Sequence, residues 1–301
     1  MKKILLITVT LIGLSSFLLI PAVAAPKWPI PDGIKTIEVN GYDMAYQETD
    51  SGTPLVLIQG AMTDYRTWDT QVPDFSKAYR TIAVSLRHFY PEKWNGDGDD
   101  FSVAQHASDV AVMIKKLNLG KVHLLGHSRG GSVALAVASL YPEVIRTLIL
   151  QDANMLPLMP ETPEKQKWMA SAKAGSDRVR ANLATGGREK AAQEWMDYTR
   201  PGTWEEAPAR VKQIILDNIG TFTESGERGN ISCADIQKFN FPVLLLNGEK
   251  SPKLYGEMFT IMRQCKPDIP APLIVPNAGH SMHRENPVFY NKGVLDFLNQ
   301  H

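Results

Sequence analysis

One short motif, Gly126-His127-Ser128-Arg129-Gly130, has the residue types and spacing of a reactive serine. It directly follows an apolar run typical of a buried strand and directly precedes a segment with helical spacing. In such a setting the sharp turn holds the serine hydroxyl clear of the sheet, and the flanking glycines leave room for the turn. The N-terminus of the following helix favours developing negative charge. The motif therefore predicts that Ser128 is a nucleophile.

A serine hydroxyl is a weak nucleophile unless a neighbouring base takes its proton. The best candidate for this base is His280, which directly follows small residues in a loop after the apolar run Leu273–Val275. His283 is its nearest competitor in the sequence. His123 lies within a predicted strand, where we expect it to be a core or sheet-face residue. The sequence therefore predicts that Ser128 and His280 meet in the fold.

Strands and helices alternate along most of the chain. Apolar residues recur at helical spacing from Val103 to Leu117, with Ser102 as the N-cap, and again after Ser128. A hairpin is predicted around Asn40-Gly41. This alternation predicts an α/β fold with a mostly parallel, mixed sheet covered by helices on both faces. The runs that suit strands buried on both faces are Pro54–Ile58, Thr81–Val84, Val122–Leu125, Leu148–Leu150 and Val243–Leu246.

The alternation stops near Met155 and resumes near Phe241. The intervening segment combines Ala, Lys, Glu and Trp with Pro and Gly breaks, which indicates several short helices. It is too long for an ordinary loop and too small for an independent core. We therefore expect a core formed by residues 25–154 and 240–301, with residues 155–239 inserted as a helical cap.

With these features together, the chain resembles the α/β-hydrolase fold family over almost its whole length after residue 24. The resemblance rests on Gln59-Gly60-Ala61 after a strand, on the serine motif, and on Ala278-Gly279-His280. It implies that Ser128 is the nucleophile, that His280 is the general base, and that the backbone amides of Ala61 and Arg129 form the oxyanion hole. Such a site requires no metal or organic cofactor.

The resemblance leaves the acid that would orient His280 ambiguous. Relatives often carry this acid three residues after the glycine that ends the seventh strand, and here that position holds Ser251. Asp152, just after the sixth strand, and Glu249, near the usual place, are the two replacements. Both preserve the order nucleophile, acid, histidine. We favour Asp152, because a group at the carboxyl end of a strand is already aimed at the site.

Composition and the serine motif narrow the function further. The chain is 44% hydrophobic and 21% charged, as in average soluble proteins, and its 32 basic and 32 acidic residues give no overall basic field for nucleic acid. Serine at the motif excludes the dehalogenases and epoxide hydrolases that resemble this fold but use aspartate there. The leading expectation is an ester hydrolase that forms an acyl-enzyme. The alternatives are a lactonase or carbon–carbon-bond hydrolase with the same three groups, and a non-catalytic ligand-binding protein.

The first 24 residues have the layout of a secretory signal peptide. A positive start, Met1-Lys2-Lys3, precedes an apolar run over residues 4–20 and the small residues Ala22-Val23-Ala24. We expect cleavage after this last alanine, and a periplasmic or secreted protein with no stable membrane anchor and a small ester or lactone as its partner. In an oxidising compartment Cys233 and Cys265 could pair. Two buried thiols are the alternative.

Overall fold

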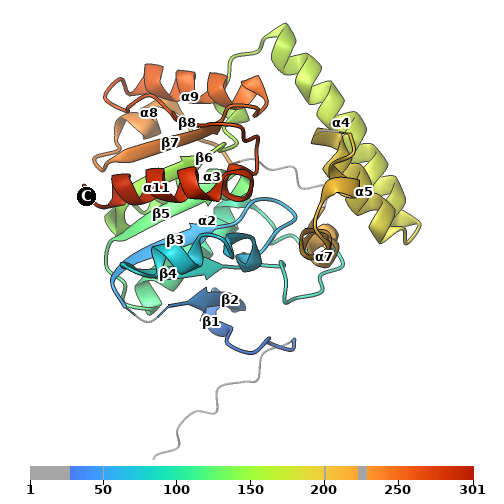
Figure 1. The fold of residues 1–301 in the computed structure, drawn as a ribbon, viewed down its shortest axis with the longest axis horizontal. Helices are drawn as coiled ribbons and strands as arrows, with labels where there is room; N and C mark the ends of the chain where they lie inside the picture. The colour runs from blue at the N-terminus through green and yellow to red at the C-terminus, as the bar shows by residue number, and fades with distance from the viewer. Residues whose placement is uncertain (1–27, 50, 200, 223–228) are drawn as a thin grey trace, which may run out of the picture.

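The computed structural model describes residues 28–49, 51–199, 201–222 and 229–301. The predicted signal peptide, residues 1–24, lies outside these ranges. Within them, eight strands form one sheet in the order β1-β2-β4-β3-β5-β6-β7-β8. The pairs β1–β2 and β2–β4 are antiparallel, and all other neighbours are parallel. The expected α/β fold with a mostly parallel, mixed sheet is confirmed (Figure 1).

The strands lie where the apolar runs predicted them, and Ser102 caps its helix by accepting from the amide of Gln105. None of the helices in the described ranges is both long and apolar enough to cross a bilayer. The strands are β1 (Lys35–Val39), β2 (Tyr42–Glu48), β3 (Thr53–Ile58), β4 (Tyr79–Val84), β5 (Val122–His127), β6 (Ile145–Gln151), β7 (Val243–Gly248) and β8 (Leu273–Val275). The helices of the core are α1 (Val72–Phe75), α2 (Val103–Lys116), α3 (Arg129–Leu140), α8 (Cys233–Gln237), α9 (Lys253–Cys265), α10 (Met282–Glu285) and α11 (Pro287–Leu298).

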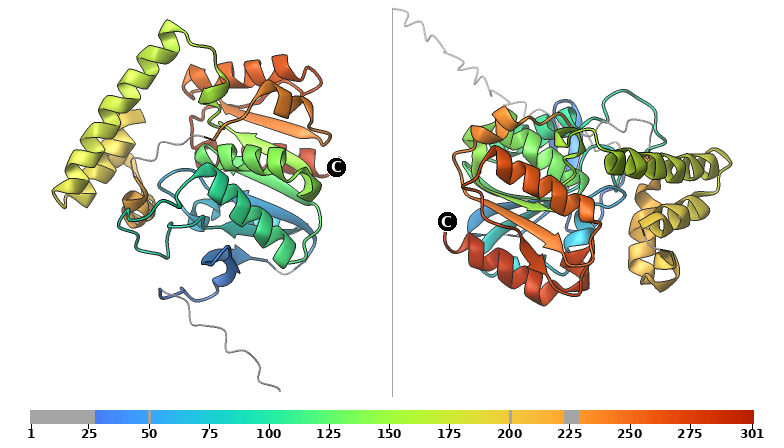
Figure 2. Two further views of the ribbon diagram at one scale, coloured as in Figure 1. Left: turned by 180° about the vertical axis from the view of Figure 1, so that it is seen from behind. Right: turned by 90° about the horizontal axis from the view of Figure 1, so that it is seen from above.

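Helices cover both faces of the sheet (Figure 2), and the central strands are buried on each side. Alternate residues of β3 show this division. Val56 and Ile58 pack in one apolar cluster with α2, α3 and α9, whereas Leu55 and Leu57 pack in another with α1 and α11. Because both faces are covered, the parallel strands are continuous apolar runs and do not alternate between apolar and polar residues.

A helical insertion separates β6 from β7, as the sequence predicted. In the described part of the chain it comprises α4 (Pro163–Ala184), α5 (Arg188–Thr199), α6 (Thr203–Glu206) and α7 (Ala209–Asn218), which stand to one side of the core (Figures 1 and 2). Apolar side chains of these helices, including buried Trp204, pack mainly against one another. Met62 from the core joins the same cluster. The boundaries that the sequence suggested for this cap, residues 155 and 239, stay a prediction.

The two cysteines form a disulfide bond between neighbouring helices. Cys233 begins α8, Cys265 ends α9, and their Cα atoms are 5.0 Å apart. Ile236 of α8 is fully buried in the same apolar cluster as α9. The structure thus selects the paired state, which the sequence left open.

We expect the double substitution Cys233→Ser and Cys265→Ser to lower the free energy of unfolding by about 3–4 kcal/mol, because the closed loop of the unfolded chain is lost. Urea denaturation of the oxidised protein and of the double variant measures this difference. Thiol titration of the denatured, unreduced protein is the accompanying check. Two titratable thiols in protein made in an oxidising compartment would contradict the pairing.

Candidate active site

Ser128 occupies a strained turn between β5 and α3. Its backbone has φ 53° and ψ −115°, outside the regions that a residue with a side chain ordinarily adopts. The strand and helix approach each other so closely that a Cβ atom on Gly126 would lie 2.3 Å from the carbonyl oxygen of Gly130. Only glycine fits at this crossing. The sharp strand–turn–helix predicted from the motif is therefore present, with Ser128 partly exposed at its tip.

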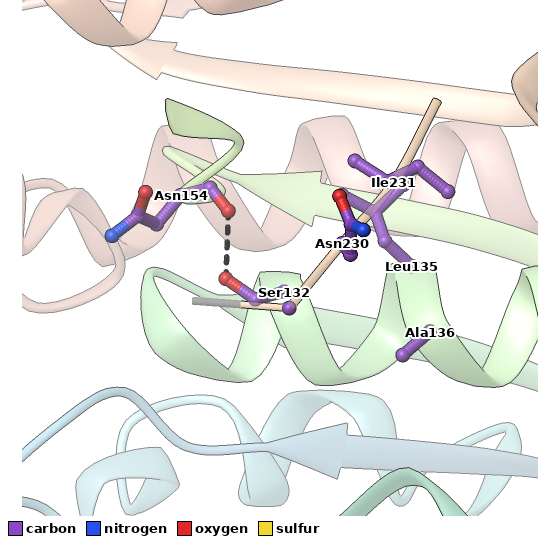
Figure 3. A pocket seen from close by; sticks show the side chains of 7 residues that line it. Ser132, Leu135, Ala136, Asn154, Asn230 and Ile231 are labelled. Atoms are coloured by element: carbon purple, nitrogen blue, oxygen red, sulfur yellow. Dashed lines mark hydrogen bonds between the residues drawn. The ribbon is translucent and has the colours of Figure 1, made fainter. Parts of the chain in front are cut away.

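Backbone hydrogen bonds fix the turn to the segment that follows β6. The carbonyl oxygen of Ser128 accepts from the amides of Gly131 at 3.0 Å, Ser132 at 3.3 Å and Asn154 at 3.2 Å. The Ser132 hydroxyl donates to the Asn154 carbonyl at 2.7 Å, beside a small cavity of about 10 Å³ (Figure 3). These bonds hold the backbone of Asp152, two residues before Asn154, in a fixed position relative to Ser128.

The segment that carries Ala61 lies against the same turn. A Cβ atom on the preceding residue, Gly60, would lie 3.5 Å from Cβ of Ser128 and 2.8 Å from Nδ1 of His127. Arg129 is the first residue of α3, where backbone amides point out of the N-terminal end of a helix. The structure therefore brings together the two segments whose amides the sequence assigned to an oxyanion hole.

The Asp152 carboxylate is the meeting point of three hydrogen-bond donors. The His280 ring donates from Nδ1 to Oδ2 at 3.0 Å, and Ser251 Oγ donates to the same oxygen at 2.6 Å. Asn247 Nδ2 donates to Oδ1 at 2.6 Å. The Asp152 side chain is 0% exposed, whereas that of His280 is 25% exposed. A carboxylate buried to this extent is stable only when such donors satisfy it.

Glu249, the alternative acid, has a different partner. Its Oε2 atom accepts from the backbone amide of Asn277 at 2.6 Å, and the residue is exposed. The structure thus brings Asp152 into contact with His280, and Glu249 supports the loop that precedes this histidine. Ser251, at the position where relatives often carry the acid, contributes the hydroxyl that binds Asp152.

Two residues that the sequence did not single out hold the backbone of His280. Its carbonyl oxygen accepts from His127 Nε2 at 3.0 Å and from Gln151 Nε2 at 3.4 Å. Burial lowers the pKa of His127 well below its usual value, so this ring is neutral. Because His127 directly precedes Ser128, its bond fastens the His280 loop to the turn of Ser128. The position of His127 inside the serine motif was the one sequence feature that could have indicated this role.

The other histidines considered from the sequence lie in the core. His283 is buried and hydrogen-bonds through Nδ1 to Gln151 and through Nε2 to Thr67. His123 bonds to Thr147 Oγ1 at 2.8 Å, and burial lowers its pKa to about 4. His123 is thus the core residue that its strand position predicted, and His283, the competitor, makes its contacts away from Asp152.

A buried polar cluster joins the cap to the segment that follows β3. Asp64, with a side chain 0% exposed, accepts from Arg66 Nη2 at 2.7 Å and from Asn218 Nδ2 at 2.6 Å. Arg66 also donates to Asp217 at 2.8 Å, so α7 is bound through both of its last two residues. Asn218 accepts in turn from the amide of Tyr90 at 2.8 Å. The position of the cap over Ala61 therefore depends on Asp64.

The loop between β4 and α2 also supports the cap, and His88 organises this loop. His88 contacts Glu92 through Nδ1 at 3.0 Å and Asp100 through Nε2 at 2.7 Å, and its ring stacks on Trp94 at 4.2 Å. Burial by itself would lower the pKa of His88, but its hydrogen bonds to the two carboxylates outweigh burial and raise it. The backbone of Trp94 packs so tightly on Gly220 that a Cβ atom there would lie 2.3 Å from the Trp94 carbonyl oxygen.

Comparison with known proteins identifies the family. The chain matches the alpha/beta hydrolase fold family over residues 53–287, which is more than half of its length. It belongs to the α/β-hydrolase fold family. The fold and the strained serine between β5 and α3 agree with this membership.

Individual relatives resemble the chain over most of its length. A 2-(acetamidomethylene)succinate hydrolase of Mesorhizobium japonicum is 23% identical over 273 residues, which cover 88% of this chain and 94% of the relative. The crystal structure of a Bacillus subtilis carboxylesterase superposes with a TM-score of 0.73 at 19% identity, covering 91% of this chain and 94% of the other. The structure of a thermophilic esterase of Thermogutta terrifontis superposes with a TM-score of 0.69 at 24% identity, covering 89% of this chain and 97% of the other. At these identities the structures show a shared fold.

We expect Asp64→Ala to lower the free energy of unfolding by about 3 kcal/mol or more, because it leaves two buried donors without their acceptor. The matched control is Asp217→Asn, which alters a partly exposed pair and should cost about 1 kcal/mol or less. Urea denaturation gives both values, and limited proteolysis shows whether cleavage begins in the cap. Equal losses in the two variants would contradict a central role for Asp64.

His88 should make stability depend on pH. Because its pKa is raised on folding, its contribution is complete below the unfolded value of about 6.5 and is lost as pH rises through the folded pKa. His88→Asn tolerates the positive φ of this position and removes the titration. The difference in unfolding free energy between the two proteins, measured by urea denaturation at several pH values, should shrink as pH rises. A pH-independent difference would refute the assignment.

Proposed function

We propose that this chain is an exported serine hydrolase that cleaves carboxylic esters through an acyl-enzyme intermediate. The observation that carries the proposal is the buried Asp152 carboxylate bound to Nδ1 of His280, on a loop fastened to the strained turn of Ser128. A serine, a histidine and a carboxylate in this order provide the nucleophile, the base and the group that orients the base.

The reaction follows from these positions. His280 Nε2 takes the proton of the Ser128 hydroxyl as the oxygen attacks the acyl carbonyl carbon. The amides of Ala61 and Arg129 stabilise the oxyanion, and each such donor is typically worth about 3 kcal/mol in the transition state. His280 then passes its proton to the departing alcohol. A water molecule, deprotonated by the same ring, attacks the acyl-enzyme, releases the carboxylic acid and restores Ser128.

Asp152 performs two tasks in this cycle. Its bond to Nδ1 fixes the tautomer in which Nε2 of His280 is free to accept a proton, and its charge stabilises the imidazolium that forms. An acid is absent from position 251, and this absence alone would favour the alternative of a non-catalytic binding protein. Since Ser251 binds an acid supplied from β6, this feature now supports a working site.

A second substrate class is suggested by one relative. The Mesorhizobium japonicum protein is a hydrolase of 2-(acetamidomethylene)succinate, which is not a simple ester. The esterase structures from Bacillus subtilis and Thermogutta terrifontis favour esters. A substrate screen should therefore place acyl esters of increasing length beside lactones and this enamide.

Export is proposed on two observations. Residues 1–24 have the three-part layout of a cleaved signal peptide. The disulfide bond between Cys233 and Cys265 is of a kind that persists in oxidising compartments. Mass spectrometry of the protein recovered outside the cytoplasm tests the proposal, with residue 25 as the expected first residue.

Substitutions in the triad test the chemistry. On p-nitrophenyl acetate and butyrate, Ser128→Ala should lower kcat by about 10⁶-fold. Asp152→Asn should lower kcat by about 10⁴-fold because it supports the wrong histidine tautomer. Glu249→Gln, the matched control, should leave kcat nearly unchanged, since the glutamine oxygen can still accept from the Asn277 amide.

Two outcomes would count against this assignment. A large loss in Glu249→Gln with little change in Asp152→Asn would make Glu249 the acid. Failure of a fluorophosphonate to label Ser128 in the wild-type protein would contradict an activated serine, whichever substrate is used.

A further inference from the structure

The ring of Tyr255 lies flat against His280. The two ring centroids are 4.7 Å apart and the planes are inclined by only 19°. Tyr255 belongs to the first turn of α9 and is partly buried. Asp152 contacts the edge of the imidazole at Nδ1, whereas Tyr255 covers one of its faces, so the two contacts restrain different motions of the ring.

The face contact acquires an electrostatic role when His280 becomes charged. In the proposed reaction the imidazole is an imidazolium from the moment it takes the Ser128 proton until it releases it. The face of an aromatic ring attracts a cation within about 6 Å of its centroid. We propose that Tyr255 is a positioning residue whose aromatic ring holds the plane of His280 and stabilises its protonated form. This inference rests on the proposed function, because it concerns the same imidazole.

A second ring, that of His127, also contacts His280. The two ring centroids are 4.7 Å apart and the planes are inclined by 47°, and burial keeps the His127 ring neutral by lowering its pKa. A neutral neighbour neither attracts nor repels the imidazolium strongly. Within the described part of the chain, the titratable or charged groups near His280 include Asp152, Tyr255, His127, His283, Arg284 and Glu285.

A single segment contacts both the Asp152 carboxylate and the face of the His280 ring. Residues 247–255 run from the end of β7 into α9, and Asn247 and Ser251 at its start bind the Asp152 carboxylate. The amide of Tyr255 donates to the Pro252 carbonyl at 3.0 Å, which sets the first turn of the helix. Further along α9, Met258 is buried in the core. The ring of Tyr255 is therefore carried by a helix anchored in the core.

The test compares Tyr255→Phe with Tyr255→Leu. Both variants lack the hydroxyl, so the difference between them reports the aromatic ring alone. From the usual strength of cation–π contacts, the leucine variant should have a kcat/KM roughly 2- to 30-fold below that of the phenylalanine variant, with the loss in kcat. Tyr255→Met provides a second non-aromatic side chain, and thermal unfolding establishes that each variant is folded.

The pH profile separates electrostatic support from simple packing. Without the ring, the imidazolium is less stable, so the acidic limb of kcat/KM should move to lower pH by roughly 0.4–1.5 units in the leucine and methionine variants relative to phenylalanine. The rate at which a fluorophosphonate labels Ser128 should show the same displacement, independently of the ester chosen.

The possible results are distinguishable. Wild-type protein that neither hydrolyses esters nor reacts with the fluorophosphonate overturns the proposed function, and this inference with it. Wild-type protein that reacts, with leucine and methionine variants indistinguishable from phenylalanine in rate and pH profile, overturns the inference alone. Lower rates with an unmoved acidic limb also overturn it, because a packing defect would then account for the loss.

Discussion

The hydrogen bond between Asp152 and His280 is the interaction on which the remaining site geometry depends. The carboxylate has no access to solvent, so it needs protein donors to remain charged, and Asn247, Ser251 and the imidazole supply them. These donors come from β7, from the turn after it and from the loop after β8. A single buried charge therefore holds three neighbouring segments of the sheet edge together and sets the direction of the histidine.

The parallel sheet makes this convergence possible. Strands β3, β5, β6 and β8 end at the same edge, and the segments that follow them carry Ala61, Ser128, Asp152 and His280 respectively. The strain at Ser128 persists because the surrounding contacts allow no relaxation. Gly126 and Gly130 let α3 pack directly against β5, and three backbone amides donate to the Ser128 carbonyl oxygen. The cap is fastened to the same edge through Asp64.

Several parts of the fold and site could be predicted because their signals are local. The buried strands were visible as apolar runs, the start of α2 as Ser102, and the sharp turn at Ser128 as a serine between glycines after a strand. The acid could not be fixed in this way, since Asp152 and Glu249 both follow strands in the required order. The roles of His127, Gln151 and Tyr255 were also beyond reach, because each acts on a residue more than twenty positions away.

By itself, the sequence determined the alternation of elements, the helical insertion and the candidates for nucleophile and base, because hydrophobic periodicity and turn chemistry operate over a few neighbouring residues. Only the tertiary structure decided which carboxylate meets His280, that Ser251 binds this carboxylate, that the cysteines pair and that an aromatic ring covers the imidazole. These contacts join segments from separate strands and helices. How close these residues lie depends on the order of the strands in the sheet, and a local sequence pattern does not contain that order.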